Sequence, residues 1–269
     1  MSRRARWSAL AGFSGGVLSG LLGGGGGAVM VPLMTGPLRM RQHVAHGTSL
    51  AVIAVTAAVA AVLYGLAGHF DWLLFAGLTA GAVTGAVAGA RLALRIPALR
   101  LRQAFGVFLL AVSLRMLLFA PSGGWLEPGP FAEFGLAGAI GLSGGLASGA
   151  LGVGGGAIFV PAMVLVLGTE QHEAQGISLV VIVVASTMAA LTHYRQGTVD
   201  TEAARWLLPT AIPGAVAGAG LATMLSGRGL QVVFAVVLSA IGVQMLTTAT
   251  RRLRAAGTTA GAAPEGARP

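Results

Sequence analysis

The sequence contains no cysteine and no lysine, and only eight of its 269 residues are acidic. Without cysteine the chain forms neither disulfide bonds nor thiolate metal sites. Charged residues make up 9% of the chain, whereas soluble globular domains carry about 25%. This scarcity of charge excludes an ordinary water-facing surface over most of the molecule.

Apolar residues dominate instead, at 55% of the chain with a mean hydropathy of +0.82. The stretches 43–68 and 135–169 contain no charged residue, and each exceeds the roughly 20 residues that span the hydrocarbon core of a bilayer. We therefore expect an all-α polytopic membrane protein. All 17 basic residues are arginine and alanine, glycine and valine are abundant, which suggests a high-GC bacterial genome and thus the bacterial inner membrane.

One module occurs twice in the chain. Residues 12–34 match residues 141–163 at 15 of 23 positions, and the same offset of 129 continues without a gap through the rest of both copies. Proline and glycine mark the segment between the copies as a linker, and the Ala/Gly/Thr/Pro composition of the C-terminal tail predicts disorder. The expected organisation is an N-terminus at 1–9, repeat 1 at 10–120, a linker at 121–138, repeat 2 at 139–249 and a disordered tail at 250–269.

Glycine clusters interrupt the first apolar segment of each module, at Gly23–Gly27 and Gly152–Gly156. Glycine costs about 1 kcal/mol relative to alanine in a helix interior, so the helix must open there. We expect each broken segment to form a re-entrant hairpin with arms of roughly 15 and 10 residues, too short to cross the membrane singly. Three transmembrane helices follow each hairpin, in the first module near 44–66, 72–94 and 102–120.

The arginines predict the orientation of these segments. With this count of spans, both termini are cytoplasmic and all arginine clusters except Arg228 fall inside, as the positive-inside rule requires. Arg41 and Glu170 occupy equivalent loops with opposite charge, which predicts that the two repeats are inverted in the membrane. Because membrane topology explains the net charge of +9, nucleic acid is not an expected partner.

Inverted repeats with broken helices place substrate sites near the bilayer midplane, where the N-termini of half-helices present free N–H groups. Backbone donors and the positive end of the helix dipole bind anions without a basic side chain. The clusters do not continue into Gly-Lys-Ser/Thr, so a phosphate-binding P-loop is excluded. We expect a small anion to bind between the two glycine loops.

Polar residues at membrane depth are costly and indicate function. Paired hydroxyl and amide side chains are candidates to complete the anion site, and two histidines are candidates to carry a coupled proton. For each serine, the alternative is a bond to a carbonyl of its own helix. The candidate substrate-binding residues are Ser19, Gly25, Gly26, Gly27, Gln42, Ser49, Ser148, Gly154, Gly155, Gly156, Gln171 and Ser178, and the proton-coupling candidates are His46 and His193.

Two other features that the copies share are expected to serve the fold rather than substrate binding. The regularly spaced glycines of 12–20 and 81–89 are typical of close helix packing. Asp71 and Asp200 each precede an apolar span, as expected of helix N-caps.

The segments SGLLGGGGGAVMVP (19–32) and SGALGVGGGAIFVP (148–161) resemble the glycine-proline signature of the sulfite exporter TauE/SafE family of membrane permeases. Gly47-Thr-Ser-Leu50 and Gly176-Ile-Ser-Leu179 fit the same family, and the resemblance covers nearly the whole chain. It implies transport of sulfur-containing anions such as sulfite, sulfonates or thiosulfate, coupled to a proton or sodium gradient.

The leading hypothesis is therefore a secondary transporter of small anions that needs no cofactor and no metal. A passive anion or ion channel is the alternative, and a cation pathway is disfavoured because the eight carboxylates fall in loops or near span ends. A membrane enzyme would need a catalytic constellation, and no metal-ligand spacing or nucleophile–base pair is recognisable.

Overall fold

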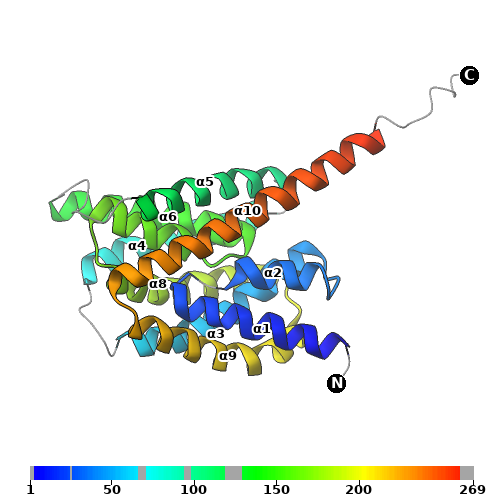
Figure 1. Ribbon diagram of the computed structural model, residues 1–269, viewed down its shortest axis with the longest axis horizontal. Helices are drawn as coiled ribbons and strands as arrows, with labels where there is room; N and C mark the ends of the chain where they lie inside the picture. The colour runs from blue at the N-terminus through cyan, green and yellow to red at the C-terminus, as the bar shows by residue number, and fades with distance from the viewer. Residues whose placement is uncertain (1–2, 25, 66–70, 94–97, 119–128, 261–269) are drawn as a thin grey trace, which may run out of the picture.

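The computed structural model describes residues 3–24, 26–65, 71–93, 98–118 and 129–260, and all regular elements in these ranges are helices (Figure 1). The helices of the first module are α1 (Arg3–Leu22), α2 (Gly27–Thr35), α3 (Gln42–Gly65), α4 (Trp72–Leu92) and α5 (Ala98–Leu118). Those of the second module are α6 (Pro130–Leu151), α7 (Gly156–Ala162) with the π-helix η1 (Met163–Leu167), α8 (Gln171–Arg195), α9 (Thr201–Met224) and α10 (Gly227–Ala260). The same offset carries the first residues of α2, α3, α4 and α5 onto those of α7, α8, α9 and α10.

Six helices are long and apolar enough to cross a membrane, namely α3, α4, α6, α8, α9 and the part of α10 up to Thr250. The prediction of an all-α, multi-pass membrane protein is therefore confirmed. Five of the six were predicted as spanning helices, whereas α6 was predicted as the first arm of the second hairpin. The remaining predicted span forms the 21-residue helix α5.

The first arms of the two broken segments are longer than predicted. α1 has 20 residues and α6 has 22, or about 30 and 33 Å at 1.5 Å per residue. α6 begins at Pro130, whose fixed φ suits the first turn of a helix. The second arms are short: α2 has 9 residues, and α7 with η1 covers Gly156–Leu167. Each segment is thus a long helix followed by a short return.

Three predicted boundaries fall within helices. Positions 10 and 139, the expected starts of the repeats, lie inside α1 and α6. The expected disordered tail begins inside α10, which continues to Ala260, because arginine, leucine and alanine at 251–256 favour a helix. The last residues of the tail, and residues 121–128 of the linker, lie outside the described ranges.

Acidic side chains cap the helices that follow the hairpins. The Asp71 carboxylate accepts hydrogen bonds from the amides of Leu73 and Leu74, and Asp200 accepts one from Ala203. Both predicted N-caps are confirmed. Glu170 caps α8 in the same way, which satisfies amides that have no partner within the helix.

Glycines bring α1 against α9 and α4 against α6. A methyl group built on Gly12, Gly16 or Gly20 would lie 2.0–2.4 Å from the carbonyl oxygens of Leu207, Ala211 and Ala215. These partner numbers rise together, so α1 and α9 run parallel. The offset carries these contacts onto Gly141, Gly145 and Gly149 of α6 against α4. The predicted packing role of these glycines is confirmed.

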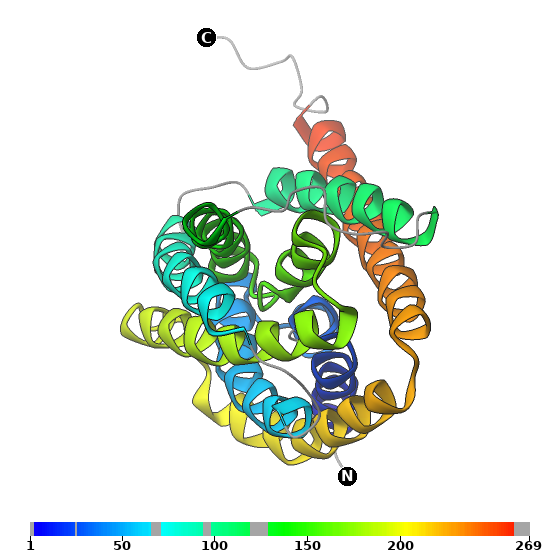
Figure 2. The same ribbon diagram turned by 90° about the vertical axis from the view of Figure 1, so that its left-hand side faces the viewer.

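α3 and α8 pack against each other, and α5 packs against α10 at one edge of the molecule (Figures 1 and 2). α3 and α8 are antiparallel, because Gly47 lies against His193 while Tyr64 near the other end bonds to Gln175. The start of α1 and the end of α10 lie at the same end of the molecule, on the right of Figure 1. We refer to this end as the N-terminal face.

Candidate functional site

The two glycine loops touch each other at the junction of the modules. A methyl group on Gly27 would lie 1.9 Å from the Gly152 carbonyl oxygen, and one on Gly156 would lie 2.3 Å from that of Gly23. Real side-chain carbons do not come so close to another atom, so only glycine allows this contact. The structure thus brings together two glycine clusters that are far apart in the sequence.

Each loop is held by a serine from the other module. The Ser178 hydroxyl donates a hydrogen bond of 2.8 Å to the Gly23 carbonyl. The equivalent Ser49 hydroxyl lies 3.0 Å from the Gly152 carbonyl oxygen and 2.8 Å from that of His46 in its own helix. Gly23 and Gly152 have φ values of +59° and +67°, in the left-handed region that favours glycine. Ser49 and Ser178 therefore position the loops, at about 1 kcal/mol per bond.

Ser19 and Ser148 are buried in the first arms, close to the loops, and their surroundings differ. The Thr56 hydroxyl lies 3.1 Å from the Ser19 hydroxyl and can donate to it. Ser148 has no hydrogen-bond partner within the described residues, because Ala185 stands where the first module has Thr56. An unbonded hydroxyl in a buried place is available to a ligand.

The short second arms begin at the junction. In α2, Val29 and Met30 donate the first hydrogen bonds, both to the Gly26 carbonyl, so the amides of residues 27 and 28 precede them. In α7, Ile158 and Phe159 donate to the Gly155 carbonyl in the same pattern. Two helix N-termini with early amides therefore adjoin the contact between the loops.

Close contacts or a left-handed backbone conformation also favour glycine at other predicted loop positions. A methyl group on Gly26 would lie 1.7 Å from the Gly15 carbonyl oxygen. Gly154 and Gly155 adopt left-handed φ values of 101° and 81°. Gly25 lies outside the described residues.

A small apolar cavity of about 20 Å³, room for about one water molecule, lies beside the junction and is partly open to solvent. Its walls come from α1, both loops, the second arms and α10, with Ala28, Ala157, Phe234 and Ile241 among the lining residues. Low polarity strengthens any hydrogen bond that a ligand makes to the backbone there.

The predicted glutamines lie farther from the loops. Gln42 and Gln171 are the first residues of α3 and α8, one turn before His46 and Gln175. Both side-chain amide nitrogens are buried without a hydrogen-bond partner in the described structure, as is the Gln171 oxygen. The structure therefore places them at the helix starts rather than at the junction.

The two predicted histidines are both buried but differ in bonding. His193 is 2.9 Å from the Thr198 hydroxyl through Nδ1 and 3.1 Å from the Gly149 carbonyl oxygen through Nε2. The His46 ring interacts with the backbone of Ala150, and the residue packs against the Gly152 loop. Both histidines therefore contact the end of α6 or the loop that follows it.

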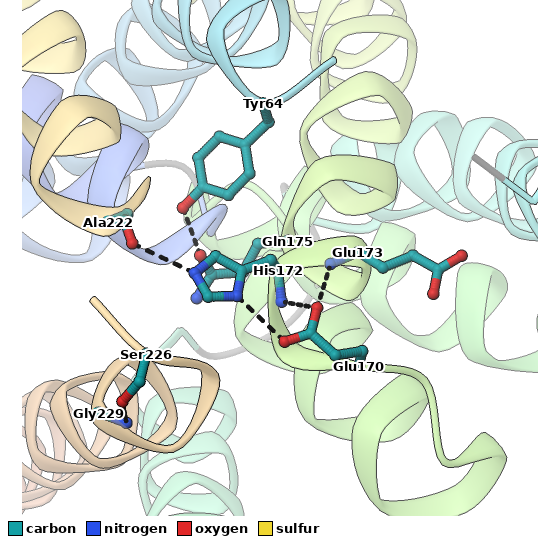
Figure 3. Close-up of polar contacts among 8 residues, drawn as sticks. All are labelled: Tyr64, Glu170, His172, Glu173, Gln175, Ala222, Ser226 and Gly229. Carbon is teal, nitrogen blue, oxygen red and sulfur yellow. Dashed lines mark hydrogen bonds and ion pairs between the residues drawn. The ribbon is translucent and has the colours of Figure 1, made fainter. Parts of the chain in front are cut away.

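The offset of 129 relates His46 and His193 to a second polar pair, which lies at the opposite end of α3 and α8. Tyr64 corresponds to His193 and Gln175 to His46, and the Tyr64 hydroxyl donates to the Gln175 side-chain oxygen (Figure 3). Nearby, the His172 ring bridges the Glu170 carboxylate and the Ala222 carbonyl, at 3.0 and 3.3 Å. These bonds join α3, α8 and α9 at the end away from the N-terminal face.

Comparison with known proteins places this architecture in a family. A model described as "Sulfite exporter TauE/SafE" matches residues 1–116 and 137–268, nearly the whole chain. The chain belongs to the sulfite exporter TauE/SafE family. This is a family of membrane transporters and not of enzymes, so the chain is a multi-pass membrane transporter. No solved structure shows significant similarity to it.

Curated relatives agree with this TauE/SafE membership. A "Probable membrane transporter protein" of Xylella fastidiosa is 29% identical over 231 residues, covering 80% of this chain and 83% of the relative. The "Probable membrane transporter protein YunE" of Bacillus subtilis is 27% identical over 263 residues, covering 87% and 94%. The similarity extends over both modules in each case.

Sequence reasoning missed several residues of this TauE/SafE chain that the structure places near the junction. Thr56 was not singled out, although it is a hydroxyl in the middle of an apolar span. Arg102 was treated only as a marker of topology. A pattern could have revealed it: equivalent positions 102 and 231 hold arginine and glutamine, and the equivalent positions 115 and 244 repeat this pair.

Proposed function

We propose that this TauE/SafE protein is a secondary transporter of small anions, with sulfur oxyanions such as sulfite, sulfonates or thiosulfate as the substrate class. The substrate binds at the contact between the two glycine loops. The observation that carries the proposal is that the N-termini of α2 and α7 adjoin this contact from two different modules. The family description supports the substrate class.

Helix N-termini favour negative charge because their amides are unpaired and the helix dipole is positive at that end. The cavity beside the junction has no charged residue in its lining. Backbone amides and the Ser148 hydroxyl are therefore the donors that we assign to the substrate. Ser19, Ser49 and Ser178 support the loops, and any direct contact of theirs with the anion remains a prediction.

The two modules are inverted relative to each other in the membrane, with both termini in the cytoplasm. Helix directions support this arrangement. α1 is parallel to α9 and α4 is parallel to α6, while α3 is antiparallel to α8, and short connections reverse the chain between α8 and α9. It follows that α1 and α6 point in opposite directions, as modules related by an axis in the membrane plane require.

Single cysteines test this orientation, because the chain has none of its own. Arg41 and Glu170 are equivalent, exposed positions. In intact cells, an impermeant thiol reagent should label the Glu170→Cys variant and leave Arg41→Cys unlabelled until the membrane is opened. Labelling of both positions from outside would contradict the inverted arrangement.

A proton or a sodium ion couples the transport. His46 is the candidate proton carrier, because it is only 1% exposed and lies against the Gly152 loop. It lies on α3, three residues before Ser49, whose hydroxyl contacts the same loop.

Flux into proteoliposomes tests the transport function. We expect saturable uptake of radiolabelled sulfite, thiosulfate or a sulfonate, raised by an imposed proton or sodium gradient and absent from protein-free liposomes. Downhill, non-saturable flux that ignores both gradients would favour the channel. No flux of any of the three anions through folded protein would contradict the proposed substrate class.

A further inference from the structure

A second, polar recess lies between α2, α5 and α10 on the N-terminal face. It has a volume of about 220 Å³ and is partly open to solvent. The residues that line it are Ala28, Pro32, Thr35, Gly36, Arg102, Gln244, Met245 and Thr248. Neither the sequence motifs nor the glycine junction accounts for this polar lining.

Arg102 gives the recess its charge. It lies on the first turns of α5 and is only 6% exposed. Burying a guanidinium is costly unless polar groups surround it, and intramembrane arginines generally face a watered cavity or a functional path. The recess lining provides the hydroxyls of Thr35 and Thr248 and the side-chain amide of Gln244. This set of groups suits a small oxyanion, because a guanidinium donates two parallel hydrogen bonds to adjacent oxygens.

The recess adjoins the cavity at the glycine junction. Ala28, in the first turn of α2, lines both spaces. On α10, Ile241 lines the junction cavity, and Met245, one turn later, lines the recess. An ion in the recess is therefore one helical turn from the place where we put the substrate.

The equivalent positions at the opposite end of the molecule are filled. Val164 and Leu165 of η1 replace Thr35 and Gly36, and Gln231 replaces Arg102. Val164 and Gln231 are each 1% exposed. Arg228 donates to the carbonyls of Met116 and Leu117 and to the Gln231 side chain, which ties α10 to the end of α5. The recess therefore depends on residues in which the two modules differ.

We propose that this recess is an oxyanion-binding site, with Arg102 as its cationic ligand, through which the anion reaches the glycine junction from the N-terminal face. The inference rests on the proposed anion transport. It adds a site that opens on one face of the protein, whereas at the other end the Tyr64–Gln175 and His172–Ala222 bonds join α3, α8 and α9 (Figure 3).

The test compares Arg102→Gln, which installs the residue of the second module, with Arg91→Gln, an exposed arginine at the end of α4. Binding is measured from the thermal stabilisation of detergent-purified protein by sulfite, thiosulfate and chloride. We expect the apparent Kd for an oxyanion to rise roughly 10- to 100-fold in Arg102→Gln, since hydrogen bonds to charged groups contribute that much. Arg91→Gln should stay within about twofold of wild type, and Arg102→Lys should recover part of the affinity because it keeps the charge but loses the planar fork.

Thr35→Val provides a second variant that keeps the arginine and installs the residue of the second module. This variant should weaken oxyanion binding severalfold. If Arg102→Gln does not fold, Thr35→Val alone tests whether the recess binds the oxyanion. Three results would each overturn the site. The first is an unchanged oxyanion affinity in the folded Arg102 and Thr35 variants. The others are equal losses of affinity in Arg102→Gln and Arg91→Gln, and no oxyanion binding by the wild-type protein.

Flux assays on the same variants separate this inference from the proposed function. If Arg102→Gln transports at the wild-type rate with an unchanged KM, the proposed role of the recess is wrong and the proposed transport function stands. If the wild-type protein binds oxyanions in an Arg102-dependent way but shows no flux, the binding site stands and the proposed transport function is wrong.

Discussion

Gly27→Ala is expected to abolish anion flux. The new methyl group would lie 1.9 Å from the Gly152 carbonyl oxygen and 2.9 Å from the Ile53 side chain, so the two loops must separate. Displacing binding groups by about 1 Å reduces rates on the order of 100-fold, and we expect at least that loss in initial uptake. Overpacking of this kind costs about 1–3 kcal/mol of stability, so much of the protein should still fold at low temperature.

The matched control is Gly138→Ala in α6. Its methyl group would have an ordinary contact of 3.8 Å with the Gly77 carbonyl oxygen. Uptake per folded molecule is measured in proteoliposomes after size-exclusion chromatography. Near-normal uptake by Gly27→Ala, or an equal loss in both variants, would show that the loop contact is not the substrate site.

Gly218→Ala is expected to cause a large loss of stability. Gly218 of α9 faces α1, and a methyl group there would lie 2.1 Å from the Val17 carbonyl oxygen and 2.9 Å from the Leu21 amide. Neither backbone can move without disturbing its own helix. We expect a loss of about 1–3 kcal/mol, which corresponds to a fall in Tm of roughly 2–12 °C.

Gly220→Ala, two residues further along the same helix, is the control, because a methyl group there has no neighbour within 4 Å. It should leave Tm unchanged or raise it, since alanine favours helices by about 1 kcal/mol over glycine. Gly89→Ala, the equivalent of Gly218→Ala in the first module, should reproduce the loss. Similar melting of all three variants would mean that close α1–α9 and α4–α6 contact does not hold the modules together.

Much of the fold could be predicted because the relevant signals are local or repeated. Apolar length indicates spans, Asp71 and Asp200 indicate helix starts, and five consecutive glycines indicate a break. The first arms were predicted too short because a helix can continue into flanking residues that hydropathy does not mark as part of an apolar span. Residues 3–7, mostly arginine, extend α1 in this way, and Pro130 in the first turn starts α6 ahead of residues 131–138.

The candidate site was predicted less completely. The glycine loops were expected to meet, and the structure brings them together. Ser49 and Ser178 were predicted to bind substrate, which stays a prediction, and the structure adds that their hydroxyls bond the loop of the opposite module. Hydroxyl direction depends on which carbonyl lies across the interface, and spacing along one helix carries no such information.

By itself, the sequence determined that the chain is a membrane protein, consists of one repeated module, breaks its helices at glycines and belongs to the family of membrane transporters that it resembles. These properties follow from composition, from hydropathy over windows of about 20 residues and from an exact offset between the copies. Only the tertiary structure decided which module each serine serves, that Ser148 lacks the partner Ser19 has, and that Arg102 lines a recess while its counterpart Gln231 is packed. Such differences arise because equivalent residues meet different neighbours once the copies fold together, and side-chain contacts across an interface depend on three-dimensional packing.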